Sequence, residues 1–264
     1  MATVKEVYEI MDRFCPFRTQ MDFDNAGFLV GRGEMKVSKI LVSLDITLPV
    51  VREAERLGAN LIISHHPVIF HPARRVTDQD PVGEILLELT EKRIAAICAH
   101  TNLDVAVGGV NDALAQTLGL KEVRVFLPQR EPDSQGRPFG LGRVGVVDPC
   151  TASEFAARVR ERLHTSGIRC VDSGREVRKV AVGGGACGDC LEDAVRQECD
   201  LFVTADVKYN VFLDAAAMNI SLIDAGHYAT ETVVVPCLTE MLAKALPDVE
   251  ILPTKVPKEV YFGL

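Results

Sequence analysis

Apolar runs typical of buried strands alternate with helix-period segments along almost the whole chain. The strand candidates are rich in Val, Ile and Leu, and they span residues 39–46, 60–65, 94–101, 141–147, 178–185, 200–206, 220–226 and 249–255. The helix candidates between them span residues 49–58, 81–93, 109–119, 152–164, 190–199, 207–219 and 231–246. This alternation predicts an α/β fold with mainly parallel or mixed sheets covered by helices.

One stretch, "PQREPDSQGRPF" at 128–139, interrupts this alternation and is rich in proline, glycine and charge. Such a composition is typical of a linker or a surface excursion. The 264 residues suffice for two cores. We therefore expect an N-terminal α/β half over residues 1–127, a second α/β half over residues 128–264, and a site between them. As an alternative for the C-terminus, the last strand returns to the first half.

Composition restricts the class of partner. The chain carries 29 basic and 37 acidic residues, a net charge of −8, and has no dense basic stretch. Nonspecific nucleic-acid binding, which needs Lys and Arg to neutralise phosphates, is not expected. No apolar run reaches the length of a membrane span, and "MATVKEVYEIMDRF" is amphipathic rather than a signal peptide. Several cysteines lie within apolar strand or helix patterns, where a cysteine usually behaves as a small hydrophobic residue; these are Cys98, Cys170, Cys199 and Cys237. We expect a cytoplasmic protein with a small-molecule substrate.

Two adjacent histidines, His65 and His66, end the apolar run "LIISHHP". Functional residues of open α/β sheets gather at the carboxyl ends of strands. Neighbouring side chains of an extended chain point to opposite faces, so the two imidazoles are poorly placed to bind one ion directly. Where the strand turns into a loop, they can flank a pair of ions. A structural role for both histidines is the alternative.

A second polar group, His100 and Asp104, follows the next strand candidate in "CAHTNLDVAVGGVND". We expect Asp104 to lie in a loop closed by two glycines, where its carboxylate can bind or bridge metal ions. His100 is a candidate ligand, proton carrier or orienting partner. Alternatively, Asp104 only caps the following helix.

A third group, His227 and Glu231, lies where a strand passes through Gly226 into a helix, in "DAGHYATE". If the helix has begun by His227, the two side chains share one helical face, one turn apart. This spacing suits two metal ligands, although His–Glu pairs of this kind also occur by chance. Besides His100, three strand ends thus supply three imidazoles and two carboxylates, from His65, His66, Asp104, His227 and Glu231. These suit two ions that share a bridging carboxylate and activate water for hydrolysis.

At this level of detail the chain resembles the Nif-three-like dinuclear metal-centre family, whose members are often named GTP cyclohydrolase I type 2 homologues. The resemblance rests on "MDFDNAGFLVG", "ISHHPVIF", "AHTNLD", "VAVGGGACGD", "TADVKYN" and "DAGHYATE", in this order. It implies two divalent ions bound by His65, His66, Asp104, His227 and Glu231. It also implies a two-domain α/β subunit of the compact form, without an inserted domain, and a ring-shaped homohexamer.

The resulting hypothesis is a metal-dependent hydrolase in which a metal-bound hydroxide attacks a small, nucleotide-like substrate, with His100 and Glu231 as catalytic residues. GTP as the substrate is implied by the resemblance alone. Mixed imidazole and carboxylate ligands suit Zn, Fe, Mn, Co or Ni. A non-enzymatic metal-binding ring scaffold or regulatory protein is the main alternative. Asn210 stands where the family often has a histidine, so a proton-transfer role at that position is not expected here.

The segment "GGGACGDC" at 183–190 has two possible uses. Its backbone amides can hold an anion, or its glycines let helix and sheet approach closely. Its Cys187 and Cys190 form a C-x-x-C motif, which can be a redox pair or half of a zinc site. A thiol redox protein is therefore a third functional alternative.

Overall fold

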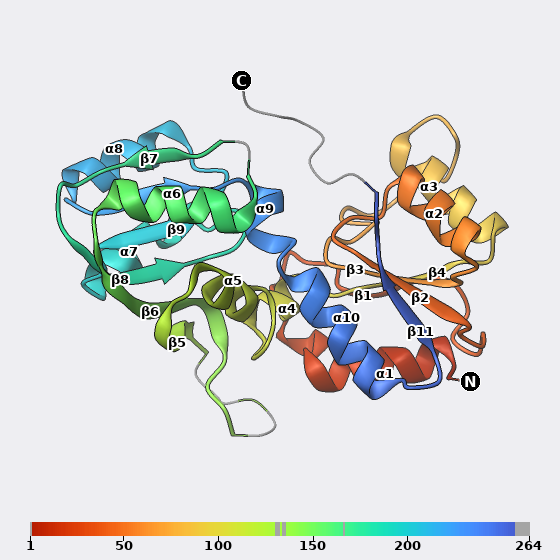
Figure 1. The fold of residues 1–264 in the computed structure, drawn as a ribbon. Coiled ribbons are helices and arrows are strands. Elements are labelled where there is room, and N and C mark those ends of the chain that lie inside the picture. Colours follow the sequence, from red (N-terminus) through yellow and green to blue (C-terminus); the bar gives the residue numbers. More distant parts are fainter. Residues whose placement is uncertain (1, 130–132, 134–135, 166, 257–264) are drawn as a thin grey trace. The chain divides into compact units, whose positions relative to one another are not determined.

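The computed structural model describes residues 2–129, 133, 136–165 and 167–256, and it contains two β-sheets with helices on both faces of each (Figure 1). This confirms the predicted α/β fold with helix-covered sheets. The chain divides into two compact units. The first combines Met1–Ala106 with Val235–Pro257, and the second contains Val107–Val234.

The first unit is built on a five-stranded sheet. Its strands lie in the order β1 (Gly27–Val30), β4 (Ala95–Cys98), β3 (Leu61–Ser64), β2 (Lys39–Ser43) and β11 (Glu250–Pro253). Strands β4, β3, β2 and β11 are parallel, and β1 pairs antiparallel with β4. The last strand of the chain therefore joins the sheet of the N-terminal part. Because β2, β3 and β4 run in the same direction, the residues that follow them emerge at one edge of the sheet.

Four long helices cover the first sheet. Helices α2 (Leu48–Leu57) and α3 (Pro81–Glu91) lie on one face, and α1 (Val4–Phe14) and α10 (Val234–Ala245) lie on the other (Figure 1). Helix α1 begins with a capping box, in which Glu6 N donates to Thr3 Oγ1 and Thr3 N donates to Glu6 Oε2. Its buried residues are Val4, Val7 and Met11, the spacing of one helical face.

The second unit is built on a six-stranded sheet. Its strands lie in the order β5 (Lys121–Pro128), β6 (Gly140–Cys150), β8 (Val177–Val182), β9 (Leu201–Thr204), β10 (Ser221–Asp224) and β7 (Arg169–Val171). Strands β8, β9 and β10 are parallel, and the other pairings are antiparallel. Helices α5 (Val110–Leu118), α6 (Ala152–Leu163) and α9 (His227–Glu231) contribute to the core on one face, whereas α7 (Leu191–Arg196) and α8 (Tyr209–Ala217) contribute to the core on the other.

The division of the chain differs from the predicted boundary at 127/128. Residues 107–127 belong to the second unit, because α5 buries Leu114 and Leu118 against the second sheet and β5 pairs with β6. The Pro- and Gly-rich stretch 128–139 connects these two paired strands. It is an excursion from a hairpin within the second unit, although residues 130–132 and 134–135 lie outside the described part.

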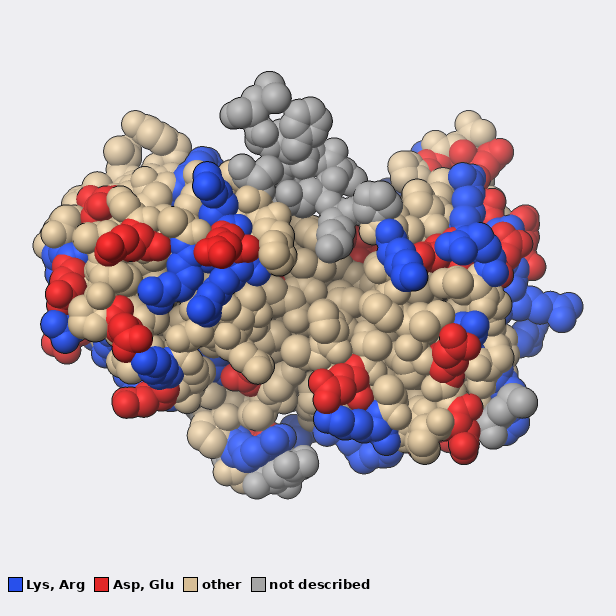
Figure 2. Space-filling model, viewed as in Figure 1, with Lys and Arg blue, Asp and Glu red and all other residues tan. Residues whose placement is uncertain are grey.

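Two further features bear on the class of protein. Across the part of the chain that the structure describes, no helix has the length and apolar character needed to cross a membrane. On the face shown in Figure 2, blue basic and red acidic side chains are interspersed. Charges of both signs are therefore present on this face of a chain whose net charge is −8.

Candidate metal centre

His65 and His66 directly follow β3, at the point where the chain leaves the sheet. The amides of both residues donate to the carbonyl of Leu44, at 3.1 and 2.8 Å. Two consecutive amides that share one acceptor form a turn, not an extended strand. The two rings therefore lie near each other, with centroids 4.9 Å apart. Because the strand ends at Ser64, the two histidines lie where the strand turns into a loop, which is the arrangement in which they can flank a pair of ions.

His100 joins these two residues in a cluster of three imidazoles. Its ring centroid lies 5.1 Å from that of His65 and 5.6 Å from that of His66. One nitrogen from each ring can be chosen so that all three lie within 4.8 Å of one another. His65 is fully buried, whereas the other two are partly exposed. Three imidazoles at this spacing form a set of nitrogen donors suited to a divalent metal ion.

Each imidazole of the cluster is anchored through Nδ1 to an oxygen atom. The partners are the Ala99 carbonyl for His65 (2.9 Å), the Asp45 carboxylate for His66 (2.8 Å) and the Asp24 carboxylate for His100 (2.8 Å). A carbonyl or an ionised carboxylate can only accept, so Nδ1 carries the proton and Nε2 of the neutral ring carries the lone pair. Histidines that bind metals in proteins are oriented in this way.

Asp24 fixes His100 and the beginning of helix α4 (Thr101–Val105) together. One carboxylate oxygen accepts from His100, and the other accepts from the amide of Thr101 at 3.0 Å. Burial raises the pKa of Asp24, but the hydrogen bonds from His100 and Thr101 outweigh this effect and lower the pKa to about 2. Asp24 is therefore an anion at neutral pH, and it holds the His100 ring from behind.

Asp104 lies in α4, one turn after His100, rather than in the predicted loop. The helix forms here because Asp24 satisfies an amide of its first turn, a contact 77 residues away in sequence that no local pattern reveals. Asp104 Oδ1 lies 3.7 Å from Nε2 of His65. The first unit thus brings together His65, His66, His100 and Asp104.

His227 and Glu231 form the corresponding group of the second unit. They are the first and last residues of α9, so the helix has begun by His227, and His227 Nε2 lies 3.0 Å from Glu231 Oε2. His227 Nδ1 contacts the Asp206 carboxylate at 2.7 Å. With Nδ1–H directed to Asp206, the Nε2 lone pair and the Glu231 carboxylate face each other. A shared proton or a shared cation holds two such acceptors together, so this pair also suits a metal ion.

The glycine-rich loop after β8 lies against Glu231. A Cβ atom on Gly185 would lie 2.1 Å from Glu231 Oε1, and φ of Gly185 is +66°. The Gly185 amide donates to Thr230 Oγ1 at 3.0 Å. Two uses were predicted for this segment, anion binding and close approach of the backbone. The described structure supports the second, because the loop backbone at Gly185 packs against the Glu231 carboxylate.

The aspartates that orient the imidazoles were not predicted as site residues. Asp45 and Asp206 could have been found, because each follows a strand whose carboxyl end contributes to the site. Asp24 gives a weaker signal, since its partner His100 lies 76 residues away. By contrast, Asp224 is structural: it accepts from the amides of Val207 and Gly226.

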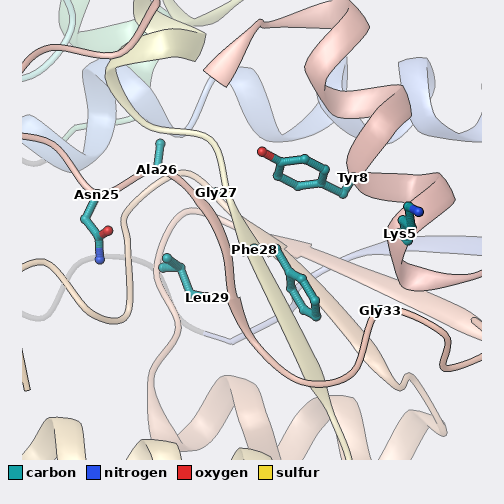
Figure 3. A pocket seen from close by; sticks show the side chains of 8 residues that line it. All are labelled: Lys5, Tyr8, Asn25, Ala26, Gly27, Phe28, Leu29 and Gly33. Atoms are coloured by element: carbon teal, nitrogen blue, oxygen red, sulfur yellow. The ribbon is translucent and has the colours of Figure 1, made fainter. Parts of the chain in front are cut away.

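A pocket in the first unit adjoins the segment that carries Asp24. It has a volume of about 470 Å³, and its lining residues are Lys5, Tyr8, Asn25, Ala26, Gly27, Phe28, Leu29 and Gly33 (Figure 3). Two aromatic rings, of Tyr8 and Phe28, and the amine of Lys5 belong to this lining. The pocket therefore combines flat apolar surfaces with a cationic group.

Comparison with known proteins identifies the family. The profile of Duf34/NIF3 (NGG1p interacting factor 3) matches residues 2–259. The chain belongs to the DUF34/NIF3 family. This membership confirms the resemblance that the sequence motifs indicated, since the match covers almost the full length.

Relatives in the DUF34/NIF3 family include two bacterial proteins named GTP cyclohydrolase 1 type 2 homolog. The protein from Streptomyces coelicolor is 40% identical over 237 residues, which cover 88% of this chain and 82% of the relative. The protein from Clostridium acetobutylicum is 33% identical over 245 residues, which cover 92% and 90%. Among solved structures, a hypothetical protein of Staphylococcus aureus is 28% identical, with a TM-score of 0.93 and 99% coverage of both chains.

Proposed function

We propose that this protein is a metal-dependent hydrolase that binds two divalent ions and acts on a small, nucleotide-like substrate. The proposed metal ligands are His65, His66, Asp104, His227 and Glu231. Zn, Fe, Mn, Co and Ni all suit this mixture of imidazole and carboxylate donors. When bound, such ions activate water and stabilise the negative charge that develops during hydrolysis.

The observation that carries the proposal is the common orientation of the imidazoles. His65, His66 and His227 all contact an oxygen acceptor through Nδ1, at 2.7 to 2.9 Å. In every case this makes Nε2 the ring atom that can coordinate a metal ion. Histidines with a purely structural role do not require the same Nδ1 contact at three positions. Metal-binding histidines typically have such a contact.

His100 and Glu231 are the proposed catalytic residues. The Asp24 carboxylate accepts from Nδ1 of His100, so Nε2 is the ring atom that would exchange a proton with the substrate. The Glu231 carboxylate lies 3.0 Å from Nε2 of His227 and is the second group proposed to move a proton.

The proposed substrate class is supported by the pocket beside Asn25. One face of the Tyr8 ring stacks on Phe17, with centroids 4.5 Å apart. The other face of Tyr8 and the Phe28 ring are the surfaces proposed to stack on a nucleobase, and Lys5 offers a cation for a phosphate. GTP itself is suggested only by the names of the relatives. Two further parts belong to the proposal. Assembly into a homohexamer rests on the family resemblance, and cytoplasmic localisation rests on the sequence pattern and the placement of the cysteines in apolar segments.

Metal content and turnover test the proposal together. Gently purified protein is analysed for bound metals, stripped with a chelator, and titrated with Zn²⁺ or Mn²⁺ while nucleotides and phosphoesters are screened for hydrolysis. We expect two ions per chain and chelator-sensitive turnover, and we expect His66→Ala to lose both. His164→Ala, at an exposed position on α6's C-terminal end, is the matched control.

The outcomes separate the functional alternatives. Binding of two ions without hydrolysis of any substrate favours the metal-binding scaffold or regulatory protein. Failure to bind ions, or equal binding by the His66→Ala and wild-type proteins, contradicts the proposed site.

A further inference from the structure

Cys187 and Cys190 lie on one tight turn at the end of the loop that follows β8. Cys187 directly precedes a 3₁₀ helix, η2 (Gly188–Cys190), and the Cys190 amide donates to the Cys187 carbonyl at 2.9 Å. Side chains three residues apart eclipse each other in 3₁₀ geometry. Turns of this kind hold the two Cα atoms within about 7 Å, close to the roughly 4.4–6.8 Å found across disulfides. The pair can therefore form a disulfide with little movement of the backbone.

The two thiols also differ chemically from the other accessible cysteines of the chain. A hydrogen bond from Cys187 lowers the pKa of Cys190, although burial and the charges of Asp193 and Asp189 oppose this effect. Burial raises the pKa of the Cys170 thiol, by contrast. Both motif cysteines are partly exposed, so a reagent can reach them. A stabilised thiolate next to a second thiol is the arrangement required for thiol–disulfide exchange.

We infer that Cys187 and Cys190 form a redox-active dithiol that exchanges with external disulfides, such as a low-molecular-weight disulfide of the glutathione type. The Cys190 thiolate attacks one sulfur of the external disulfide, forms a mixed disulfide and releases one thiolate. The Cys187 thiol loses its proton and attacks the Cys190 sulfur, which releases the second thiolate. The dithiol is oxidised by two electrons, the external disulfide is reduced to two thiols, and the two protons are taken up by the released thiolates.

This redox site is linked to Glu231 by hydrogen bonds of the same loop. The Cys187 amide donates to Thr204 Oγ1, and this hydroxyl donates to the Gly185 carbonyl, both at 3.0 Å. Gly185 in turn lies against Glu231. A bond between Cys187 and Cys190 restricts the motion of the loop that holds Gly185 beside Glu231. This link, which rests on the proposed function, makes oxidation a regulator of metal affinity.

Redox titration with glutathione tests the dithiol without reference to metal. Metal-free protein is equilibrated at fixed ratios of reduced to oxidised glutathione, quenched in acid, alkylated and analysed by intact mass and peptide mapping. We expect a 187–190 disulfide that appears and disappears reversibly with the ratio. Cys187→Ser should instead accumulate a glutathione adduct on Cys190, because the resolving thiol is absent. Cys170→Ser, which removes an exposed thiol on β7, should behave as wild type.

The redox activity of the dithiol and its effect on metal affinity can be contradicted independently. Alkylation of both Cys187 and Cys190 at every glutathione ratio overturns the dithiol, whatever the protein binds. If the disulfide forms, Zn²⁺ titration of the oxidised and reduced proteins tests the link, and we expect oxidation to change the affinity by about tenfold or more. Equal affinities remove the link but leave the dithiol intact, and absence of Zn²⁺ binding in both forms removes the proposed function instead.

Discussion

The Asp24 carboxylate accepts a hydrogen bond from Nδ1 of His100 at 2.8 Å. The Asp24 side chain is fully buried by this contact and its neighbours. The hydrogen bonds from His100 and Thr101 favour the ionised carboxylate in the folded protein, so protonation of Asp24 has a measurable consequence for stability.

Acid should therefore destabilise the protein in part through Asp24. The pKa of Asp24 is about 2 in the folded protein, below the ordinary value of 3.8. A lowered folded-state pKa contributes stability above the unfolded-state value, and this contribution is lost as the pH falls from about 4 to about 2. The contribution is roughly 2 kcal/mol. Urea unfolding between pH 5 and pH 2.5 measures it.

Asp24→Asn should lack this component of the acid dependence and should be less stable at neutral pH. Asp22→Asn, an exposed neighbour in the same segment, is the control and should keep the wild-type dependence. If the free energy of unfolding depends on pH in the same way in the wild-type and Asp24→Asn proteins, Asp24 is not a source of the acid dependence.

Asp45 and Asp206 should each contribute to metal affinity without contacting an ion. Both carboxylates hold an imidazole through Nδ1, and their side chains are 47% and 56% exposed, so replacement should disturb the fold little. We expect Asp45→Asn and Asp206→Asn to weaken metal binding by about 10- to 100-fold. Isothermal titration of the metal-free variants measures this loss. Unchanged affinity in both variants would argue against Nε2 as the donor atom.

Gly185→Ala should displace the Glu231 carboxylate. The new methyl group would lie 2.1 Å from Glu231 Oε1, and the positive φ adds backbone strain of about 1–2 kcal/mol. Gly174→Ala is a matched control, since Gly174 has φ of +74° and no heavy atom within 4 Å of its Cβ position. Both variants should lose similar stability from strain. Only Gly185→Ala should also lose metal affinity, by about tenfold or more, and equal affinities would show that the loop adapts.

Asp112→Ala should destabilise the second unit. The Arg143 side chain is 2% exposed and that of Asp112 is 30% exposed, and Arg143 Nη2 donates to Asp112 Oδ2 at 2.8 Å. Because Arg143 keeps its bonds to the Gly140 and Gly142 carbonyls, the expected loss is about 1–3 kcal/mol, the cost of a buried donor left without a partner. Thermal unfolding monitored by circular dichroism measures the loss. Asp148→Asn breaks the exposed pair with Lys121 and should leave the melting temperature almost unchanged. A similar small effect for both variants would show that Arg143 finds other acceptors.

Features that depend on neighbouring residues were predictable from the sequence. Strand β3 and the histidines after it follow from one apolar run, and the spacing of His227 and Glu231 follows from the helical period. Family membership was also predictable from short motifs, because each motif is a continuous stretch of sequence. Several of these motifs lie at the strand ends that carry the candidate site residues.

Features that depend on distant partners were not predictable in this way. The start of α4 at Thr101 requires the Asp24 carboxylate. The turn that brings His65 and His66 close together requires the carbonyl of Leu44, the residue that follows β2. The assignment of α5 to the second unit requires knowledge of which sheet covers Leu114. In each case the deciding interaction joins segments whose proximity only the fold creates.

The described residues of the first unit come from two segments, one before and one after the second unit, whereas the described residues of the second unit, 107–234, are continuous. During synthesis on the ribosome, residues 107–234 are therefore made before β11. Strand β2 lies between β3 and β11, so it is an edge strand until β11 pairs with it. A nascent chain that stalls just after residue 234 would thus carry residues 107–234 of the second unit but a first unit without α10 and β11.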